Sequence, residues 1–571
     1  MKQLINVKQW KKNSMRLLIG AFLLWFVIAF LIYPNFNIIL ASFRTESGFS
    51  FTIVRKLFES PIAMDGLKNS FILAISLAIT TNIVGIFIVL VSEYFEIKGA
   101  KLLKIGYMTT FIYGGIILVS GYSMIYGENG IVTKTLASFF PNFNVQWFGG
   151  FWAVLFVMTV STTTSHMMFL GNAIKSIDNY TIEAAKNMGA SSFYIIRRIV
   201  LPVVLPTIFA ITILQFLGGL SAFAAPLIIG GKDFQTIAPL ILELNKIPGS
   251  QGLALMLSLV LGLTTILLLI LFTKLEKGGT FFSISKTKAV YVKQKINHKS
   301  LHIFVHAIAY LLFIIYVMPV VLIIAFSFTN SAAIHEVKLS FSAFTLDNYL
   351  TVFHDIEKIT PFFNSANFSI QAAIAVTIIV LLGVGIRRKH DNLFTQFIEY
   401  AFLIPWMLPS TLIAIGFLTT YDEPKLIIGN KVLIGTTEIL VLAYIIILIP
   451  ITSRLLRASY QSVDQDYERA AKSLGASSFY TFRRIVLPML LPTVLALIVL
   501  NFNSLLSDYN IAAFLSHPLK EPLGLLIRRY TSVEATGDTQ ALIYVFSTIL
   551  MAIAAITVSI VYGWLLKEKK K

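Results

Sequence analysis

The sequence predicts an all-α integral membrane protein with about twelve transmembrane helices. Of its 571 residues, 56% are hydrophobic and 13% are charged, whereas soluble domains carry about 25% charged residues. Its long apolar runs approach the roughly 20 residues that a helix needs to cross the hydrocarbon core of a bilayer. Because these runs are continuously apolar rather than alternating, they favour helices over a transmembrane barrel.

The twelve predicted spans form two groups of six. The first group covers residues 17–41, 69–92, 105–126, 150–171, 201–230 and 252–273, and the second covers 303–328, 367–386, 396–419, 433–453, 487–515 and 541–566. We therefore predict two homologous six-helix modules, residues 1–273 and 303–571, joined by a basic cytoplasmic linker at 274–302. The basic opening segment precedes an apolar run too long for a signal peptide, so we interpret that run as a retained first helix.

The charge distribution predicts the orientation in the membrane. The chain has 46 lysines and arginines against 28 acidic residues, a net charge of +18. These basic residues are concentrated in alternate loops, which by the positive-inside rule predicts a multi-pass protein of the cell membrane with both termini cytoplasmic. We expect the protein to interact with the lipid bilayer and not with nucleic acid. The absence of cysteine excludes disulfides, thiolate metal sites and a cysteine nucleophile.

One segment of the sequence occurs twice. Residues 183–206, EAAKNMGASSFYIIRRIVLPVVLP, align without a gap with residues 469–492, RAAKSLGASSFYTFRRIVLPMLLP, and 17 of the 24 positions are identical. The spans around the two copies share little beyond their hydrophobicity. We infer that both segments contact the same kind of surface.

Each copy predicts a short helix, a glycine turn and a second helix. Alanines favour the first helix, Gly189 can adopt the left-handed conformation that ends it, and Ser191 or Ser192 can cap the next one. Pro202 follows at the start of a span, where a missing N–H costs least. The corresponding residues of the second copy are Gly475, Ser477, Ser478 and Pro488.

The pattern E-A-A, three residues, G, nine residues, I-x-L-P resembles the EAA loop of ABC importer permeases of the binding-protein-dependent kind. The first copy, in the loop 178–202, matches at Glu183, Ala184, Ala185, Gly189, Ile199, Leu201 and Pro202. The second copy, in the loop 464–488, matches at Ala470, Ala471, Gly475, Ile485, Leu487 and Pro488. It has Arg469 where the family usually has glutamate. Glu468 precedes it by one residue, a step of about 100° around a helix, so the two loops need not make equivalent contacts.

The resemblance implies a type I ABC importer fold and a coupling helix in each loop. It assigns ATPase coupling to Glu183, Ala184, Ala185, Gly189, Ala190, Glu468, Arg469, Ala470, Ala471, Gly475 and Ala476. The implied partners are two copies of a cytoplasmic ABC ATPase subunit and an extracytoplasmic solute-binding protein. The sequence contains no G-x-x-x-x-G-K-[ST] phosphate loop. We therefore expect a transport subunit without catalytic residues or a cofactor of its own, with ATP used by the partner subunits.

Polar residues inside spans are candidates for the substrate path, because burying them in lipid is costly. In the span after each EAA loop, polar residues recur at matching positions, and the second copy adds more. The candidates are Gln215, Ser221, Asn501, Asn503, Ser507 and Asp508. The alternatives are hydrogen bonding between helices and a position at the outer membrane boundary.

Three histidines recur at four-residue intervals and would share one helical face: His298, His302 and His306. A metal face is one interpretation of this spacing. Because no nearby carboxylate completes a site, we interpret them as interfacial side chains and predict no metal site.

The fused layout resembles the ferric iron permeases, with thiamine, phosphonate and polyamine permeases as relatives. The segments SAFAAPLIIGG from Ser221 and LSDYNIAAFLSHPLKEPLG from Leu506 are similar to the corresponding segments of iron permeases. The resemblance favours ferric iron as cargo and leaves the other solutes open. Two other classes stay open, an ion-coupled secondary transporter built from duplicated halves and a membrane scaffold or regulator for a cytoplasmic ATPase.

Overall fold

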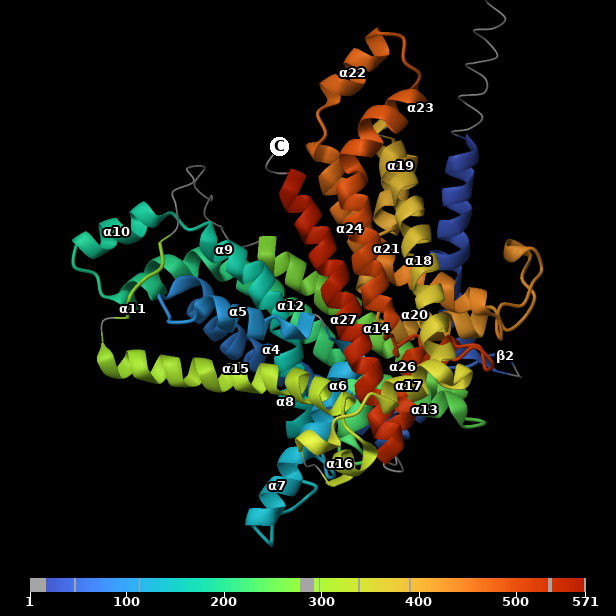
Figure 1. The fold of residues 1–571 in the computed structure, drawn as a ribbon. Helices are drawn as coiled ribbons and strands as arrows, with labels where there is room; N and C mark the ends of the chain where they lie inside the picture. The colour runs from blue at the N-terminus through green and yellow to red at the C-terminus, as the bar shows by residue number, and fades with distance from the viewer. Residues whose placement is uncertain are drawn as a thin grey trace, which may run out of the picture.

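The computed structural model of the protein describes residues 17–45, 48–111, 113–277, 292–296, 298–336, 339–389, 392–531 and 537–568. Within these ranges the chain is almost entirely helical (Figure 1). The two strands there, β1 (Arg44–Thr45) and β2 (Gly48–Phe49), form one short antiparallel hairpin. The predicted all-α class is confirmed.

The helices of the first half follow one another in chain order. They are η1 (Val27–Ile32), α2 (Tyr33–Phe43), α3 (Thr52–Glu59), α4 (Pro61–Val89), η2 (Leu90–Tyr94), α5 (Ala100–Tyr107), η3 (Thr109–Phe111), α6 (Gly115–Tyr126), α7 (Ile131–Phe139) and α8 (Gly150–Thr162). After these come η4 (His166–Leu170), α9 (Gly171–Lys175), α10 (Asn179–Asn187), α11 (Ser192–Ile195), η5 (Ile196–Val200), α12 (Leu201–Leu220), η6 (Pro226–Gly230), α13 (Ile237–Lys246) and α14 (Gln251–Lys277).

The second half repeats this plan. Its helices are α15 (Lys299–Ser327), α16 (Ser331–Glu336), η7 (Phe341–Ala343), α17 (Asp347–His354), α18 (Ile356–Lys389), α19 (Leu393–Ala401), η8 (Ile404–Met407), α20 (Ser410–Thr420) and η9 (Leu426–Ile428). They continue with α21 (Thr437–Ser462), α22 (Gln465–Ser473), α23 (Ser478–Thr481), η10 (Phe482–Val486), α24 (Leu487–Leu506), α25 (Ala512–Leu515), α26 (Leu523–Tyr530) and α27 (Gly537–Glu568).

Ten helices of the described chain are long and apolar enough to span a membrane, or twelve if each of two bent pairs is one span. The bent pairs occupy the third predicted span of each half. Ala100–Phe111 and Gly115–Phe139 meet at 111°, and Leu393–Met407 and Ser410–Thr420 meet at 107°. At the first break, α6 begins at Gly115, whose φ of 58° lies outside the right-handed helical region. The second contains Pro409, directly before α20. Spans 105–126 and 396–419 are therefore not straight helices.

The fifth span of each half is shorter than hydropathy predicts. The predicted spans 201–230 and 487–515 end as helices at Leu220 and Leu506. After each end the chain turns and forms a short buried helix, α13 or α26. A serine from the long second helix accepts the first backbone N–H of each: Ile237 N donates to Ser70 Oγ at 2.9 Å, and Leu523 N donates to Ser365 Oγ at 2.8 Å. After Leu220 the chain stays mostly apolar up to Gly230, and after the polar residues 507–510 it is apolar again at 511–515. Hydropathy alone therefore does not mark the early helix ends.

The first span of the chain packs on the second half. This span, Leu17–Phe43, joins the hydrophobic cluster that α18, α20 and α21 build. The indole N–H of Trp25 donates to the Ile427 carbonyl at 2.7 Å. The Tyr421 hydroxyl donates to the Ala29 carbonyl inside this cluster. These bonds tie the beginning of the chain to residues almost 400 positions away.

The first helix of the second half packs on the first half in return. Helix α15 lies along α5 and α6 (Figure 1). The Tyr107 hydroxyl donates to the Ala309 carbonyl at 2.7 Å, and the Tyr122 hydroxyl donates to the Ile315 carbonyl at 3.0 Å. Each half is thus completed by the first helix of the other half.

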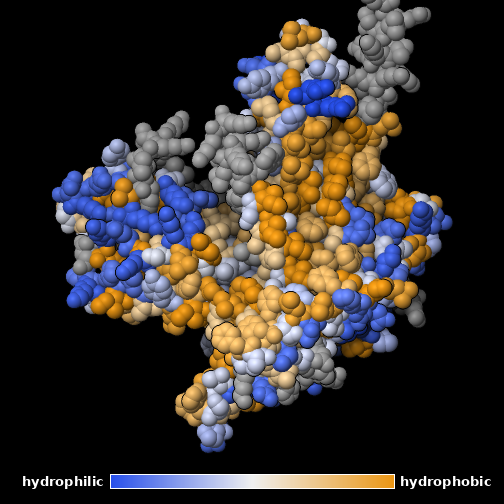
Figure 2. All heavy atoms as spheres, viewed as in Figure 1, coloured by the Kyte–Doolittle hydropathy of each residue, from blue (hydrophilic) through white to orange (hydrophobic). Residues whose placement is uncertain are grey.

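Figure 2 shows a hydrophobic surface over the long helices, such as α24 and α27, between hydrophilic ends. Hydrophilic residues gather around α10 and α11 and around α22 and α23. This distribution is the one expected for helices in lipid whose connecting loops lie in water.

Close packing between α12 and α4 predicts an unequal response of two neighbouring glycines. A Cβ added at Gly219 would lie 2.7 Å from Ala74 Cα, whereas one added at Gly218 would meet nothing within 4 Å. We expect Gly219→Ala to destabilise the protein by about 1–3 kcal/mol, because the two helices must move apart. Gly218→Ala is the matched control and is expected to leave stability nearly unchanged. Thermal unfolding of the purified protein in detergent measures both, and equal melting temperatures would contradict this packing.

Candidate coupling loops and central cavity

The first EAA loop folds as a helix–turn–helix. The Asp178 carboxylate accepts the Tyr180 backbone N–H at 3.0 Å and begins α10. Gly189 ends the helix with a φ of 83°. The Ser191 hydroxyl then accepts the Tyr194 N–H at 3.2 Å and begins α11. The predicted glycine turn is confirmed, and the first serine of the pair is the cap.

The second EAA loop has the same local geometry. Asp464 caps α22, Gly475 has a φ of 80°, and the Ser477 hydroxyl accepts the Tyr480 N–H at 3.2 Å. In each copy the chain then passes through a π-helical turn, η5 or η10, into the long fifth helix. Figure 1 shows the pairs α10–α11 and α22–α23 projecting from the ends of the long helices, well apart from each other.

Both loops expose large apolar side chains at matching positions. Met188 is 81% exposed and Leu474 is 89% exposed, each directly before the glycine turn. Phe193 and Phe479 are both 72% exposed. We call these four residues the apolar loop surface. Exposed apolar groups of this kind mark interaction sites. They were not among the residues predicted from the sequence, although apolar residues retained in two hydrophilic loops are a signal for such a surface.

The acidic residues of the two loops differ. Glu183 is exposed and accepts a hydrogen bond from Asn179 Nδ2 at 2.8 Å. Arg469, at the same position of the second copy, is exposed and pairs with Asp466 at 3.2 Å. Glu468 instead forms an ion pair with Arg388 of α18 at 2.9 Å and is only 22% exposed. The one-residue shift therefore turns this carboxylate toward its own chain.

A cavity of about 530 Å³ lies between the two halves. The first half contributes the broken third span, with Phe111, Tyr113, Gly114, Gly115, Ile116 and Ile117. The second half contributes α21, α24, α27 and the turn after α24, with Leu448, Ile451, Leu500, Asn501, Asn503, Ser504, Leu506, Ser507, Asp508, Tyr509, Asn510, Leu550, Ala554 and Val558. Most of its polar groups come from the second half, and Asp508 is the charged residue in this lining.

Four of the six candidate path residues line this cavity: Asn501, Asn503, Ser507 and Asp508. Gln215 and Ser221 are not in its lining. Gln215 is buried and donates to the Thr162 carbonyl and the Ser165 hydroxyl, which is the helix-to-helix bonding of the alternative interpretation. Asn501 makes a similar bond to Thr452 at 3.0 Å while also lining the cavity.

Asp508 shapes the wall that it belongs to. Its carboxylate accepts the backbone N–H groups of Ile511 at 3.1 Å and Ala512 at 3.2 Å, which holds the turn before α25. Tyr444 of α21 also hydrogen bonds to this carboxylate. Behind it, α26 approaches so closely that a Cβ at Gly524 would lie 2.3 Å from the Asp508 carbonyl oxygen. The carboxylate is therefore fixed at the cavity edge.

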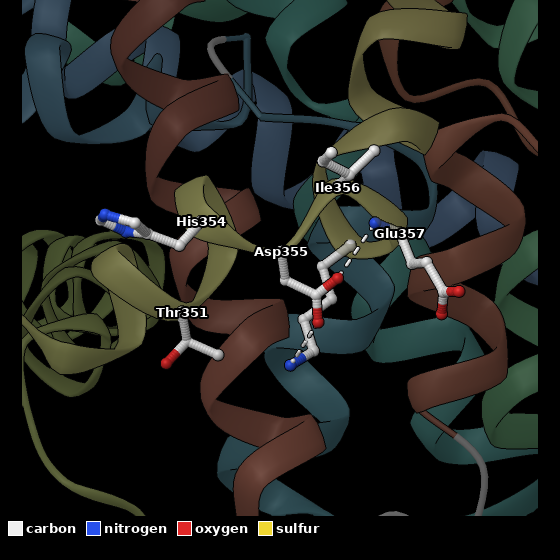
Figure 3. Close-up of a pocket in the computed structure, with 6 residues that line it drawn as sticks. Thr351, His354, Asp355, Ile356 and Glu357 are labelled. Carbon is white, nitrogen blue, oxygen red and sulfur yellow. Dashed lines mark hydrogen bonds and ion pairs between the residues drawn. The ribbon is translucent and has the colours of Figure 1, made fainter.

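A second, shallow pocket lies at the corner between α17 and α18 (Figure 3). Figure 3 shows His354 and Glu357 on opposite sides of Asp355, whose carboxylate meets Lys358 Nζ at 3.0 Å. The hydrogen bond from Lys358 lowers the pKa of this exposed carboxyl group. Among the described residues, no group of three or more histidines and carboxylates could hold a metal ion. The rings of His302 and His306 lie 4.0 Å apart between centroids and are tilted by 32° to each other.

Comparison with protein families adds an independent finding. The model of the family described as "Binding-protein-dependent transport system inner membrane component" matches residues 15–278 and 375–570. The two matches contain the two EAA loops, one in each.

Individual relatives agree with this match. The chain is 36% identical to a probable ABC transporter permease protein, y4fN, of Sinorhizobium fredii, over 92% of both chains. It is 22% identical to the ferric transport system permease protein FbpB of Actinobacillus pleuropneumoniae, over 88% of this chain and 72% of that protein. A crystal structure of a bacterial ABC transporter involved in alginate import aligns with a TM-score of 0.40 and 19% identity, over 48% of this chain and 99% of that one.

The bonds of Asp508 predict a local effect of its removal. Asp508→Ala leaves the N–H groups of Ile511 and Ala512 without their acceptor, which costs about 1–3 kcal/mol when such donors are buried. We expect hydrogen exchange of these amides to accelerate roughly 5- to 150-fold, as followed by mass spectrometry of peptides from the turn. Asp508→Asn retains an acceptor oxygen and should exchange close to the wild-type rate. Unchanged exchange in the alanine variant would show that the carboxylate does not hold the turn.

Proposed function

Because the chain belongs to the family of binding-protein-dependent transport system inner membrane components, as the permease subunit of an ABC importer, we propose that it forms both transmembrane modules of a ferric iron importer. In this proposal one chain supplies two coupling loops to two copies of one cytoplasmic ATPase subunit. The observation that carries it is the helix–turn–helix present twice, with the same caps and glycine turns.

Identical ATPase subunits are favoured by the likeness of the two loop surfaces. The apolar loop surface presents a methionine or leucine and a phenylalanine at the same positions of each copy. The acidic position differs, with Glu183 in one loop and Arg469 in the other. We propose that the shared apolar residues supply the common docking contact. Glu183 adds a charged contact in the first loop only, because Glu468 is engaged by Arg388.

Both termini are proposed to be cytoplasmic, with the coupling loops on the same side. Arginine pairs follow each coupling helix, Arg197 with Arg198 and Arg483 with Arg484, which fits the positive-inside rule. The outer loops would then receive an external solute-binding protein. The path would run through the cavity between the halves, past Asn501, Asn503, Ser507 and Asp508.

Ferric iron is proposed as cargo from the fused length and the likeness to ferric permeases. The cavity lining supports a path for a chelated cation, since it offers one carboxylate among amides and hydroxyls. With a single charged side chain, this lining would hold such a cation only weakly. Selection would fall to the binding protein, so the permease wall need only tolerate the cargo. Thiamine, polyamines and phosphonates are the other solutes to be compared.

The cargo is tested by uptake in energised cells with and without the gene. We expect selective loss of ferric iron uptake, with thiamine, polyamine and phosphonate uptake measured in parallel. Loss of another solute would replace iron and keep the importer. Uptake that follows an ion gradient and persists without ATP would contradict the importer and favour a secondary transporter.

The docking role of the apolar loop surface predicts the effect of Phe193→Ala and Phe479→Ala. Both side chains are exposed, so their removal spares the fold, and the expected loss of affinity for the ATPase is roughly 5- to 30-fold for each. Titration of the purified ATPase against the permease in nanodiscs measures this affinity. Phe341→Ala removes a phenylalanine that is 99% exposed elsewhere and serves as the control. Equal ATPase binding by all three variants would refute the docking role.

A further inference from the structure

A buried carboxylate joins three helices where the second, third and fourth spans of the first half meet. Glu93, at the end of the second span, is only 8% exposed. It pairs with Lys104 of α5 at 2.5 Å and with Lys175 of α9 at 3.2 Å. Lys175 lies three residues before Asp178, the cap of the coupling helix. One acid is thus shared by two bases at the base of the first coupling loop.

The second half has a cluster of the same kind at the same place. Glu399 of α19 is 18% exposed and pairs with Arg387 of α18 at 2.8 Å. It also pairs with Arg457 of α21, seven residues before Asp464, the cap of the second coupling helix. Again one acid is shared by two bases, and the cluster joins the second, third and fourth spans (Figure 1).

Each cluster pairs one acid with two bases, in a different order. In the first half Lys293, which donates to the Ser92 carbonyl at 2.6 Å, adds a further positive charge near Glu93. In the first half the acid is on the second span and the bases are on the third and fourth. In the second half the acid is on the third span and the bases are on the second and fourth. The span that leads into the coupling helix is basic in both, as Lys175 and Arg457. Between the two halves, the acid and one base have exchanged places on the second and third spans, while the ionic link among three spans is present in both.

Each cluster lies between a coupling helix and the cavity wall. In the first half, Lys104 is on the helical segment Ala100–Phe111, and Phe111 at its end lines the cavity. In the second half, Arg457 is on α21, which lines the cavity at Leu448 and Ile451. A displacement of the coupling helix can therefore reach these wall residues through the cluster.

We propose that Glu93 and Glu399 are positioning residues that lock the coupling loop of each half to its cavity wall, so that movement of the ATPase subunits moves the wall. This rests on the proposed function. The carboxylates touch neither cargo nor ATP. They act by keeping three helices together. If the helices separated, the largely buried carboxylate would be left without a compensating positive charge, which is costly.

The exchanged order of charges supplies a direct test. The double variant Arg387→Glu with Glu399→Arg gives the second cluster the charge order of the first, with Arg457 unchanged. Each single variant leaves three like charges or two acids against one base. We expect both single variants to bind and activate the ATPase while moving the wall less, and the double variant to restore the movement. In each single variant we expect the equilibrium constant for the ATP-dependent movement of the wall to fall roughly 2- to 30-fold.

The wall movement can be measured without knowing the cargo. The chain has no cysteine, so spin labels at Phe111→Cys and Ser504→Cys are the only ones on the permease, and both positions line the cavity. Electron–electron resonance of the reconstituted complex gives the distance between them with and without ATP. ATP hydrolysis and ATPase binding are measured on the same samples. Asp355→Asn, which breaks the exposed Asp355–Lys358 pair, is the control.

The possible outcomes are distinct. A normal ATP-dependent distance change in both single variants would overturn the proposal. If the single variants lost ATPase binding together with the distance change, the role would be merely structural and the proposal would be overturned. Failure of the double variant to restore the distance change would also overturn the proposal. If the wild-type complex shows no ATP-dependent change at all, the importer function itself fails.

Discussion

A peptide group inside a bilayer has no water to bond with, so every backbone N–H and C=O must find a partner within the protein. Most of this chain meets the constraint with helix. Where helix stops at membrane depth, the structure provides other partners, as Ser70 and Ser365 do for the first amides of α13 and α26. The breaks in the third spans lie against protein or line the cavity. In the described residues, the irregular backbone after α24 that forms the polar wall of the cavity packs against α26 and α21.

Sequence patterns predict the parts of this fold that depend on local chemistry. Ten spans, the glycine turns and the serine caps all follow from residues close together in the chain. The early ends of α12 and α24 do not, because apolar residues continue beyond both ends, up to Gly230 in the first half and again at 511–515 in the second. The wall formed by Tyr113 to Ile117 depends on which half faces which, and no local pattern contains that information. For the same reason Gln215 and Asn501 look equivalent in sequence, yet only Asn501 lines the cavity.

The two halves retain their geometry while their charges have diverged. Arg388 illustrates this, because it pairs with Glu468 and also donates to the Val463 carbonyl at 2.8 Å, bracing α22 against α18. In the described part of the first half, no ion pair holds α10 in this way. An ion pair therefore ties α22 to its module, whereas α10 is held by the buried side chains of Ile182 and Ala185. The polar groups of the cavity also lie mainly in the second half.

The exchange of first helices has a consequence for biosynthesis. The first span enters the membrane early, but Tyr421, which bonds to Ala29, is 392 residues further along the chain. At a synthesis rate of about 5–20 residues per second, that partner emerges roughly 20 to 80 s later. During this interval the first span can pack on α14 of its own half, but it lacks the residues of α18, α20 and α21 that cover its other side. A ribosome that stalls before α20 would leave the face of α2 that packs on α20 without its partner, which would expose the nascent chain to membrane quality-control proteases.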